Sequence, residues 1–246
     1  MSKPTPKRWL TQPTLEFEGA NMSGARLLKY MMLSNLPGAE GEKYTRKYNQ
    51  LAAKRQFSNA VKQASGKICI DLGANLGDYT LNMAQTAKKV YAFEPDPWTC
   101  DALRENLSGL ANVEIVEAAA GTSEGSVSLF RHQEFEKNRT LNSQSSSVIA
   151  AKSNISSQNA VVVRQIDFLS FIRDLNEDIC VLKIDIEGAE VDLLEALLDD
   201  VNLLERIQNV FAETHESRIP GHASRVEDLR RRVLGLKQTK INLYWE

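Results

Sequence analysis

Short apolar runs alternate with amphipathic segments along most of the chain after residue 66. The run Ile68–Leu72 is short and rich in β-branched residues, as a central parallel strand is. Similar strand-like runs follow at Lys89–Glu94, Asn112–Ala119, Ile179–Gly188, Gln208–Glu213 and Ile241–Trp245. Helix-like spacing falls between them, at Gly77–Ala87, Pro97–Ser108, Asp167–Leu175, Ala189–Leu198 and Arg225–Leu234. This alternation predicts an α/β fold with a doubly wound, mostly parallel sheet and right-handed crossovers.

The middle of the chain departs from this alternation. Gly125–His132 alternates with period two and predicts an edge strand or a hairpin, and Ala160–Gln165 predicts another strand. Leu141–Asn159 is rich in Ser and Asn and is too long and polar for a core connection. We interpret it as a mobile loop. A lid over the site is favoured over an inert linker, because long loops in compact domains are usually functional.

The segment before Ser65 follows neither pattern. Met1–Pro37 contains prolines and one apolar cluster, Leu27–Leu33, and Gly41–Ala64 is polar and compatible with a helix. We therefore predict a helical or irregular extension over residues 1–64, with one or two helices forming a cap, and an α/β domain over residues 65–246.

Charge is distributed unevenly along the chain. Met1–Lys67 contains 12 Lys/Arg and 4 Asp/Glu, and the remaining residues contain 18 Lys/Arg and 28 Asp/Glu, which together give the net charge of −2. A basic first third can meet an anionic substrate, an acidic surface or nucleic acid, or it can simply be the solvated face of a helix. The composition, 42% hydrophobic and 25% charged, is that of an ordinary globular protein.

The cysteines and the amino-terminal residues bear on the cellular compartment. Cys69, Cys100 and Cys180 have no metal-ligand spacing, and Cys69 and Cys180 lie in strand-like runs, so we interpret these two as small buried hydrophobic residues. The amino terminus lacks the apolar core of a secretory signal, and no apolar run is long enough to span a bilayer. We expect a cytoplasmic protein.

The turn after the first strand carries the clearest chemistry. In Asp71-Leu-Gly73-Ala-Asn75-Leu-Gly77-Asp78, the glycine positions of a dinucleotide fingerprint hold Gly73, Asn75 and Asp78. Asn75 blocks the close approach of a pyrophosphate, and the carboxylate of Asp78 would repel it. S-adenosylmethionine carries no phosphate. An acidic turn suits its ammonium and sulfonium groups, and helix amides near Gly77 suit its carboxylate.

Glu94 supports this cofactor prediction. It lies one strand–helix unit after Asp71 and ends the second predicted strand, where a carboxylate can accept hydrogen bonds from both ribose hydroxyls. A glycine turn and a helix-capping glutamate would each be weak evidence alone. Their order on consecutive strand–helix units favours an S-adenosylmethionine site.

Charged residues gather at the ends of two later strands. Lys183 and Asp185 share a strand face, as do Glu213 and His215 if their strand continues through Thr214. Lys183 needs a partner inside an apolar strand, with Asp185 or Glu213 as candidates. This cluster could position an acceptor hydroxyl and remove its proton. It could instead hold a divalent cation through Asp185, Glu213 and His215, which we do not favour, or be a structural ion-pair network.

Three segments resemble the FkbM-type methyltransferases, a family of class I S-adenosylmethionine-dependent O-methyltransferases. They are Asp71–Thr80, Val90–Pro97 and, most specifically, Leu182–Glu190 (Leu-Lys-Ile-Asp-Ile-Glu-Gly-Ala-Glu). A weaker element, Asn142–Ser147, has Gln144 where the family has glycine. The resemblance implies a seven-stranded class I sheet. It implies cofactor contacts at Asp71, Gly73, Asn75, Gly77, Glu94 and Ala119, acceptor-side residues Asp185 and Glu187, and substrate contacts at Asn142 and Ser146.

We therefore expect an S-adenosylmethionine-dependent O-methyltransferase that acts on a hydroxyl of a sugar, glycan or glycolipid. Its expected catalytic residues are Lys183, Asp185, Glu187, Glu213 and His215, without a metal ion. One alternative keeps the fold and changes the acceptor to RNA or protein, although the amino-methylating Asn/Asp-Pro-Pro-Tyr/Phe motif is absent. Another is a non-catalytic binding protein on the same fold, and a third, a nicotinamide dehydrogenase, is disfavoured by Asn75 and Asp78. The oligomeric state is not determined by the sequence.

Overall fold

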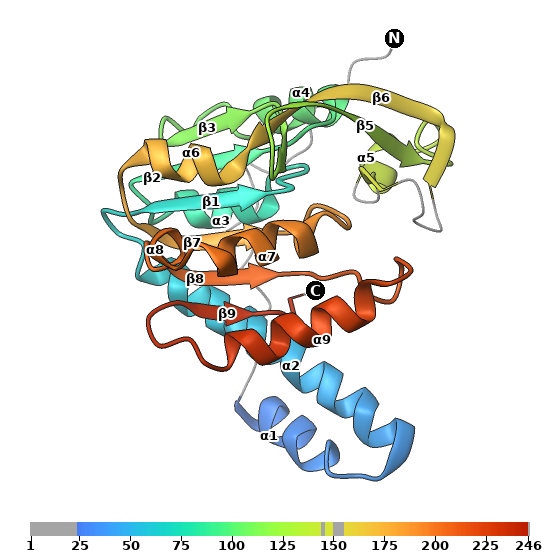
Figure 1. The fold of residues 1–246 in the computed structure, drawn as a ribbon, viewed down its shortest axis with the longest axis vertical. Coiled ribbons are helices and arrows are strands. Elements are labelled where there is room, and N and C mark those ends of the chain that lie inside the picture. Colours follow the sequence, from blue (N-terminus) through green and yellow to red (C-terminus); the bar gives the residue numbers. More distant parts are fainter. Residues whose placement is uncertain (1–23, 144–145, 150–154, 246) are drawn as a thin grey trace.

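A six-stranded parallel sheet organises the computed structural model, which describes residues 24–143, 146–149 and 155–245 (Figure 1). The strands lie in the order β3 (Val113–Val116), β2 (Lys89–Phe93), β1 (Ile68–Leu72), β7 (Ile179–Ile184), β8 (Ile207–Ala212) and β9 (Lys240–Asn242), and every pair is parallel. The predicted α/β fold class is confirmed. All five residues of β1 and all six of β7 are buried, because helices cover both faces of the sheet.

The helices divide between the two faces. The last turns of α2 (Gly38–Lys62) and the helix α3 (Asp78–Ala84) pack on one face, and α4 (Pro97–Asn106) covers β2 on that same face. The other face buries the apolar sides of α6 (Phe168–Leu175), α7 (Glu190–Asp199), α8 (Val201–Leu204) and α9 (His222–Val233). Two large apolar clusters therefore pack on either side of the central strand pair β1 and β7.

A second sheet lies beside the carboxyl edge of β2 and β3. It pairs β6 (Ile155–Asp167) with β4 (Ala119–Gly121) in parallel and with β5 (Gly125–His132) antiparallel. The prediction of seven strands in the main sheet is therefore wrong for the part of the chain that the structure describes. Two predicted strands pair with each other in the second sheet, and the predicted third strand divides between the sheets at Glu117 and Ala118.

The predicted loop Leu141–Asn159 is shorter than its polar composition suggested. The short helix α5 (Arg139–Asn142) overlaps its start, and β6 begins at Ile155. Between them, Ser147 forms an isolated bridge with Phe130 of β5, and each residue donates its amide to the other's carbonyl oxygen at 2.8 to 2.9 Å. Part of the segment, residues 144–145 and 150–154, lies outside the described residues, so its prediction as a lid stays a prediction.

The first described helices form a hairpin that projects from the α/β body (Figure 1). It consists of α1 (Gly24–Leu33) and the first half of α2. The second half of α2 belongs to the core: Phe57 is fully buried and lies 4.7 Å from Trp245 and 5.4 Å from Phe211, measured between ring centroids. Within the described ranges, no helix combines the length and apolarity that crossing a membrane requires.

Candidate active site

The loops after β1 and β7 meet where the strand order reverses. Strands β2 and β3 lie on one side of β1, and β7, β8 and β9 lie on the other. Open α/β sheets bind ligands at such a switch point. Gly73 has a φ of +78°, and a Cβ atom there would lie 1.8 Å from the carbonyl oxygen of Asp185. Only glycine fits, because both the backbone conformation and the neighbouring backbone exclude a side chain.

A first cavity opens beside this crossing, with an empty volume of about 710 Å³ when the space open to solvent is counted. Such a volume suits a ligand of nucleoside size. Apolar side chains line one part of its wall: Phe93, Ala118, Ala119, Ala120, Leu129 and Val148. Polar and acidic residues line another: Asn75, Glu94, Ser143, Ser146, Gln165, Asp185 and Glu187. The first cavity therefore offers both an apolar surface for a flat ring and an acidic surface for a cation.

The carboxylate of Glu94 lies directly after β2 in the wall of this cavity. Its Oε2 accepts a hydrogen bond from the amide of Asn75, and its Oε1 accepts one from the amide of Asp96, each at 2.9 Å. Burial raises the pKa of Glu94 to about 8, and the hydrogen bond from the Asp96 amide opposes this shift. Each oxygen keeps a further lone pair that can accept a ligand hydroxyl.

Four of the six residues predicted to bind the cofactor line the first cavity: Gly73, Asn75, Glu94 and Ala119. Gly77 lies behind it. A Cβ atom on Gly77 would lie 2.8 Å from the side chain of Leu103 and 3.2 Å from that of Leu107. Gly77 therefore allows the turn before α3 to pack on α4. The spacing of the glycines could not distinguish this packing role from a ligand contact.

Asp71 also lies behind the cavity, in a buried ion pair with Lys183. Asp71 is fully buried; its Oδ2 accepts from Thr80 Oγ1 at 2.7 Å, and its Oδ1 lies 3.1 Å from Lys183 Nζ. The same ammonium lies 3.6 Å from Asp185 Oδ2 and donates to Gly73 O at 3.3 Å. Of the partners predicted for Lys183, Asp185 is present but is farther away than Asp71.

The ammonium of Lys183 connects the two central loops. Burial lowers the pKa of Lys183, but the carboxylates of Asp71 and Asp185 raise it by more, so the side chain stays charged. It is 1% exposed and does not line the first cavity. Its position suits the holding of Asp185 rather than contact with a substrate.

The segment predicted to contact substrate is only partly described. The Asn142 side chain lies outside the described side chains. Its neighbour Ser143 lines the first cavity and donates through Oγ to Asn75 Oδ1 at 3.0 Å. Ser146 also lines the cavity, and its buried Oγ has no hydrogen-bond partner among the described residues. A buried hydroxyl without a partner is a candidate contact for a bound ligand.

His215 lies among four acidic residues that follow strands β7 and β8: Asp185, Glu187, Glu190 and Glu213. We call these five residues the acid–histidine cluster. Nδ1 of His215 lies 3.0 Å from Glu190 Oε1. Its Nε2 lies 3.0 Å from Glu187 Oε2, 3.2 Å from Glu213 Oε1 and 4.0 Å from Asp185 Oδ1. Both Glu187 (φ +59°) and His215 (φ +47°) have left-handed backbones. Such sparsely populated conformations are concentrated at functional sites.

The acid–histidine cluster shifts the pKa values of two of its members. Burial lowers the pKa of His215, but hydrogen bonds to Glu187, Glu190 and Glu213 raise it by more, to about 12. His215 is therefore an imidazolium at neutral pH. Burial raises the pKa of Asp185 to about 6; Lys183 opposes this shift, and the neighbouring carboxylates of Glu213 and Glu187 add to it. A carboxylate with this pKa is ionised at neutral pH and more basic than an ordinary aspartate.

The cluster also contains a candidate set of metal ligands. Asp185, Glu187 and His215 each offer a ligand atom, and these atoms lie within 4.8 Å of one another. The set differs from the predicted one in Glu187, which takes the place of Glu213. Both nitrogens of an imidazolium carry protons, so a metal ion would bind only after His215 lost one of them.

A second cavity lies on the other side of the cluster, between α2, the loop after β8 and α9. Its empty volume is about 1190 Å³ when the space open to solvent is counted. Glu213 and His215 line the second cavity, whereas Asp185 and Glu187 line the first. The acid–histidine cluster therefore separates the two cavities. The remaining lining residues include Thr45, Arg46, Asn49, Gln50, Ser217, Arg218, Arg230 and Tyr244.

Sequence reasoning missed two sets of residues in this site. One is Glu190, which is fully buried and accepts hydrogen bonds from the amides of Ile186 and Gly188 at 3.0 and 2.6 Å. The only signal for it was its place at the end of Leu182–Glu190. The other set is the group of α2 residues in the second cavity. No pattern in a polar helix indicates that it lies beside His215 in space, because the two are far apart in the sequence.

Comparisons with known proteins place the chain among methyltransferases. Residues 71–235 match the methyltransferase FkbM domain family. The chain is 30% identical over 164 residues to methyltransferase 1 of Beauveria bassiana, a match covering 61% of this chain and 65% of that protein. An uncharacterized protein of Methanocaldococcus jannaschii is 39% identical over 79 residues, which cover 30% of this chain and 29% of the relative. The chain thus spans less than two thirds of each of these relatives.

One solved structure carries the same family name. The methyltransferase FkbM of Methylobacillus flagellatus is 15% identical, with a TM-score of 0.38 and coverage of 74% of this chain and 46% of that one. A similarity this distant adds no argument about activity.

Proposed function

Because the chain belongs to the FkbM methyltransferase family, which implies use of S-adenosylmethionine, we propose that it is an O-methyltransferase acting on a carbohydrate hydroxyl. One observation carries this proposal: the acid–histidine cluster lies between two cavities, with Asp185 and Glu187 lining one and Glu213 and His215 lining the other. A donor in the first cavity and an acceptor in the second would approach each other at these carboxylates. Methyl transfer between two bound molecules depends strongly on such alignment.

The first cavity fits the methyl donor. Glu94 has lone pairs for ribose hydroxyls, Ser146 offers an unpartnered hydroxyl, and the alanines of Ala118–Ala120 with Phe93 offer a flat apolar surface for adenine. The carboxylate of Glu187, which lines this cavity, suits the ammonium and the sulfonium. When bound, S-adenosylmethionine supplies an electrophilic methyl group. Asp71 and Gly77 support the turn that forms this cavity, rather than contact the donor.

Asp185 has the properties of a general base in this arrangement. Its pKa of about 6 leaves it ionised at neutral pH, and its Oδ1 lies 4.0 Å from Nε2 of His215, which lines the second cavity. Lys183, 3.6 Å away, holds the carboxylate in place. We assign Asp185 the removal of the acceptor hydroxyl proton. Glu187 and Glu213 accept from the imidazolium of His215, and together these residues orient the acceptor. Lys183 acts as a positioning residue.

The second cavity supports a polyhydroxylated acceptor. Its wall offers a hydroxyl at Thr45, an amide at Asn49, guanidinium groups at Arg46 and Arg218, and the ring of Tyr244, which is 42% exposed. Sugars are bound by such mixtures of hydrogen-bonding groups and aromatic faces. Since α2 supplies several of these groups, the amino-terminal extension contributes directly to acceptor recognition in this proposal.

A transfer assay with methyl-labelled S-adenosylmethionine tests the proposal. The protein is incubated with glycan and glycolipid fractions, with and without a chelator, and S-adenosylhomocysteine binding is measured by calorimetry. We expect binding and a base-stable, chelator-resistant label in a carbohydrate fraction. Absence of S-adenosylhomocysteine binding would refute the donor site. Label found only in RNA or protein would show that the acceptor is not a carbohydrate. Loss of label in the presence of the chelator would show that the reaction needs a metal ion.

A further inference from the structure

The projecting hairpin has an apolar surface that no described residue covers. Helix α1 has no buried residue, although most of its side chains are apolar. Tyr30 packs against Tyr44 of α2, with the ring centroids 6.0 Å apart. On the remaining surface, exposed fractions reach 51% for Leu28, 45% for Met31, 67% for Met32 and 40% for Leu36. Four large apolar side chains exposed so close together indicate an interaction surface rather than scattered surface residues.

Basic residues lie on the same two helices as this apolar surface, and they lack acidic partners among the described residues. Arg26 and Lys47 each lie 5.9 Å from the ring centroid of Tyr30, and Lys43 lies 6.0 Å from that of Tyr44. Lys29 is exposed on the same helix as Arg26.

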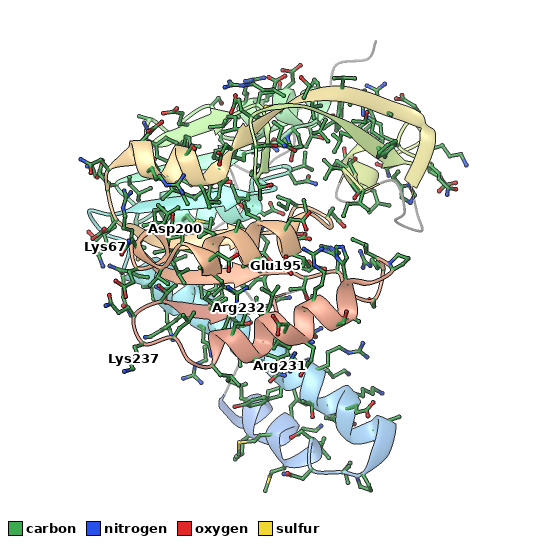
Figure 2. The ribbon with its side chains drawn as sticks, in the orientation of Figure 1. Lys67, Glu195, Asp200, Arg231, Arg232 and Lys237 are labelled. Carbon is green, nitrogen blue, oxygen red and sulfur yellow. The ribbon has the colours of Figure 1, made fainter. Side chains whose placement is uncertain are left out.

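The basic residues of α9, by contrast, form ion pairs with carboxylates. Arg231 is paired with Asp228 at 3.1 Å, and Arg232 is paired with Asp199 at 2.5 Å; both arginines are labelled in Figure 2. These cations of the α/β body thus have a carboxylate nearby. The cations of the hairpin are instead available to an external anion.

We propose that α1 and the first half of α2 bind an anionic lipid surface. Helices that lie in the membrane interface combine long apolar side chains on one side with Lys and Arg beside them, and tyrosines favour the headgroup level. The exposed leucines and methionines would enter the acyl boundary, and Arg26, Lys29, Lys43 and Lys47 would meet the anionic headgroups. A second copy of the chain is a poorer occupant, because pairing two hairpins would bring like charges together.

This docking would affect the acceptor as well. Helix α2 carries Lys43 and Lys47 of the basic set, and it contributes Thr45, Arg46 and Asn49 to the second cavity. We infer that the carbohydrate acceptor is lipid-linked and enters the second cavity from the membrane surface. This step rests on the proposed function. Lipid binding itself does not depend on that function.

Vesicle flotation of the full chain tests the docking without any methyl donor. Vesicles of phosphatidylcholine mixed with the anionic lipid phosphatidylglycerol are compared with vesicles of phosphatidylcholine alone, at low and at high salt. We expect binding only to the anionic vesicles, reduced at high salt. The double variant Leu28→Ser/Met32→Ser and the quadruple variant Arg26→Gln/Lys29→Gln/Lys43→Gln/Lys47→Gln should each lower the bound fraction at least tenfold.

Matched controls separate this surface from general hydrophobicity and charge. Leu234→Ser and Val162→Ser remove leucine and valine side chains that are 85% and 77% exposed elsewhere, and Arg231→Gln removes an exposed charge of α9; all three should bind vesicles as the parent does. Unchanged S-adenosylhomocysteine binding verifies that each variant is folded. The proposal would be overturned if the parent failed to bind anionic vesicles, or if the hairpin variants bound them as well as the parent. It would also be overturned if light scattering showed a dimer that these variants abolish. If the parent protein binds anionic vesicles but transfers no methyl group, the docking proposal stands and the proposed function is refuted.

Discussion

The imidazole of His215 and the carboxylate of Glu190 form a buried pair, with 3.0 Å between Nδ1 and Oε1. Glu190 is the first residue of α7, and its two oxygens also accept the amides of Ile186 and Gly188. The pair therefore fixes the loop after β7 and the ring of His215 at once. Since Nδ1 donates to Glu190, Nε2 is directed at Glu187 and Glu213. This contact therefore sets the orientation of the His215 ring within the acid–histidine cluster.

Replacing Glu190 should destabilise the fold. In Glu190→Gln, the imidazolium loses the fully buried carboxylate among its three partners, and the amide group of Gln opposes one of the two backbone donors. Removing one partner of a buried ion pair costs about 3 kcal/mol or more. The measurement is the free energy of unfolding from urea denaturation at pH 7. Glu195→Gln is the matched control on the same helix (Figure 2), where the partially exposed pair with Arg225 should contribute less than about 1 kcal/mol. Equal losses in the two variants would contradict the buried-pair account.

The charge of His215 should make stability depend on pH. Its folded pKa, about 12, lies above the ordinary value of 6.5, so the folded state holds a proton that the unfolded state releases. The resulting stabilisation is complete below pH 6.5 and is lost as pH rises toward the folded pKa. We expect the stability difference between the parent and His215→Gln to shrink by about 1 kcal/mol per pH unit between pH 7 and 9. A difference that grows with pH would mean that His215 is neutral.

Gly73 and Gly66 offer a comparison between steric contact and backbone strain. Both have positive φ values, +78° and +73°, but a Cβ on Gly66 would meet nothing within 4 Å. Gly66→Ala should therefore cost only the strain of a left-handed alanine, about 1–2 kcal/mol. Gly73→Ala should cost more and should also weaken S-adenosylhomocysteine binding, because the loop at Asp185 must move. Equal losses of stability with unchanged binding in both variants would show that the contact at Asp185 is unimportant.

The sheet was predictable because its pattern is local. The apolar runs at Ile68–Leu72 and Ile179–Ile184 are typical of strands in a buried parallel sheet. Acidic and glycine residues at the end of each run form the switch point. The cofactor-side residues Gly73, Asn75 and Glu94 lie next to these strand ends in the sequence. Their placement follows from the topology alone.

The remaining features depend on contacts between distant segments, which no local pattern records. The family resemblance implied a cofactor contact at Asp71, whereas in the structure Asp71 lies within β1 and is paired with Lys183 and Thr80. The second cavity requires α2 to lie beside the loop at His215. Similarly, the pairing of β5 with β6 is decided by the register of two strands that a long polar segment separates in the sequence. The sequence pattern identified both strands but not the sheet to which they belong.

Glu94 should make cofactor affinity depend on pH. Its pKa of about 8 in the ligand-free protein means that it is largely protonated at pH 6. Two ribose hydroxyls donating to its carboxylate would favour the ionised form. S-adenosylhomocysteine should therefore bind more tightly as pH rises from 6 to 8, up to about tenfold per pH unit, and level off above 8. Calorimetry across this range checks the trend, and Glu94→Gln should bind weakly with no such slope. The same slope in Glu94→Gln would assign it to another group.

Asp185→Asn should separate catalysis from cofactor binding. If Asp185 removes the acceptor proton, kcat/KM of the parent should rise with pH through about 6, the pKa of this carboxyl, and then level off. The asparagine variant cannot accept the proton, so its activity should fall about 100- to 10,000-fold, while S-adenosylhomocysteine affinity changes little. Asp192→Asn, at a carboxylate that is 60% exposed on α7, should keep both activity and the pH profile. If Asp185→Asn instead loses affinity and activity in proportion, its carboxylate holds the donor, and the base must be sought at Glu187 or Glu213.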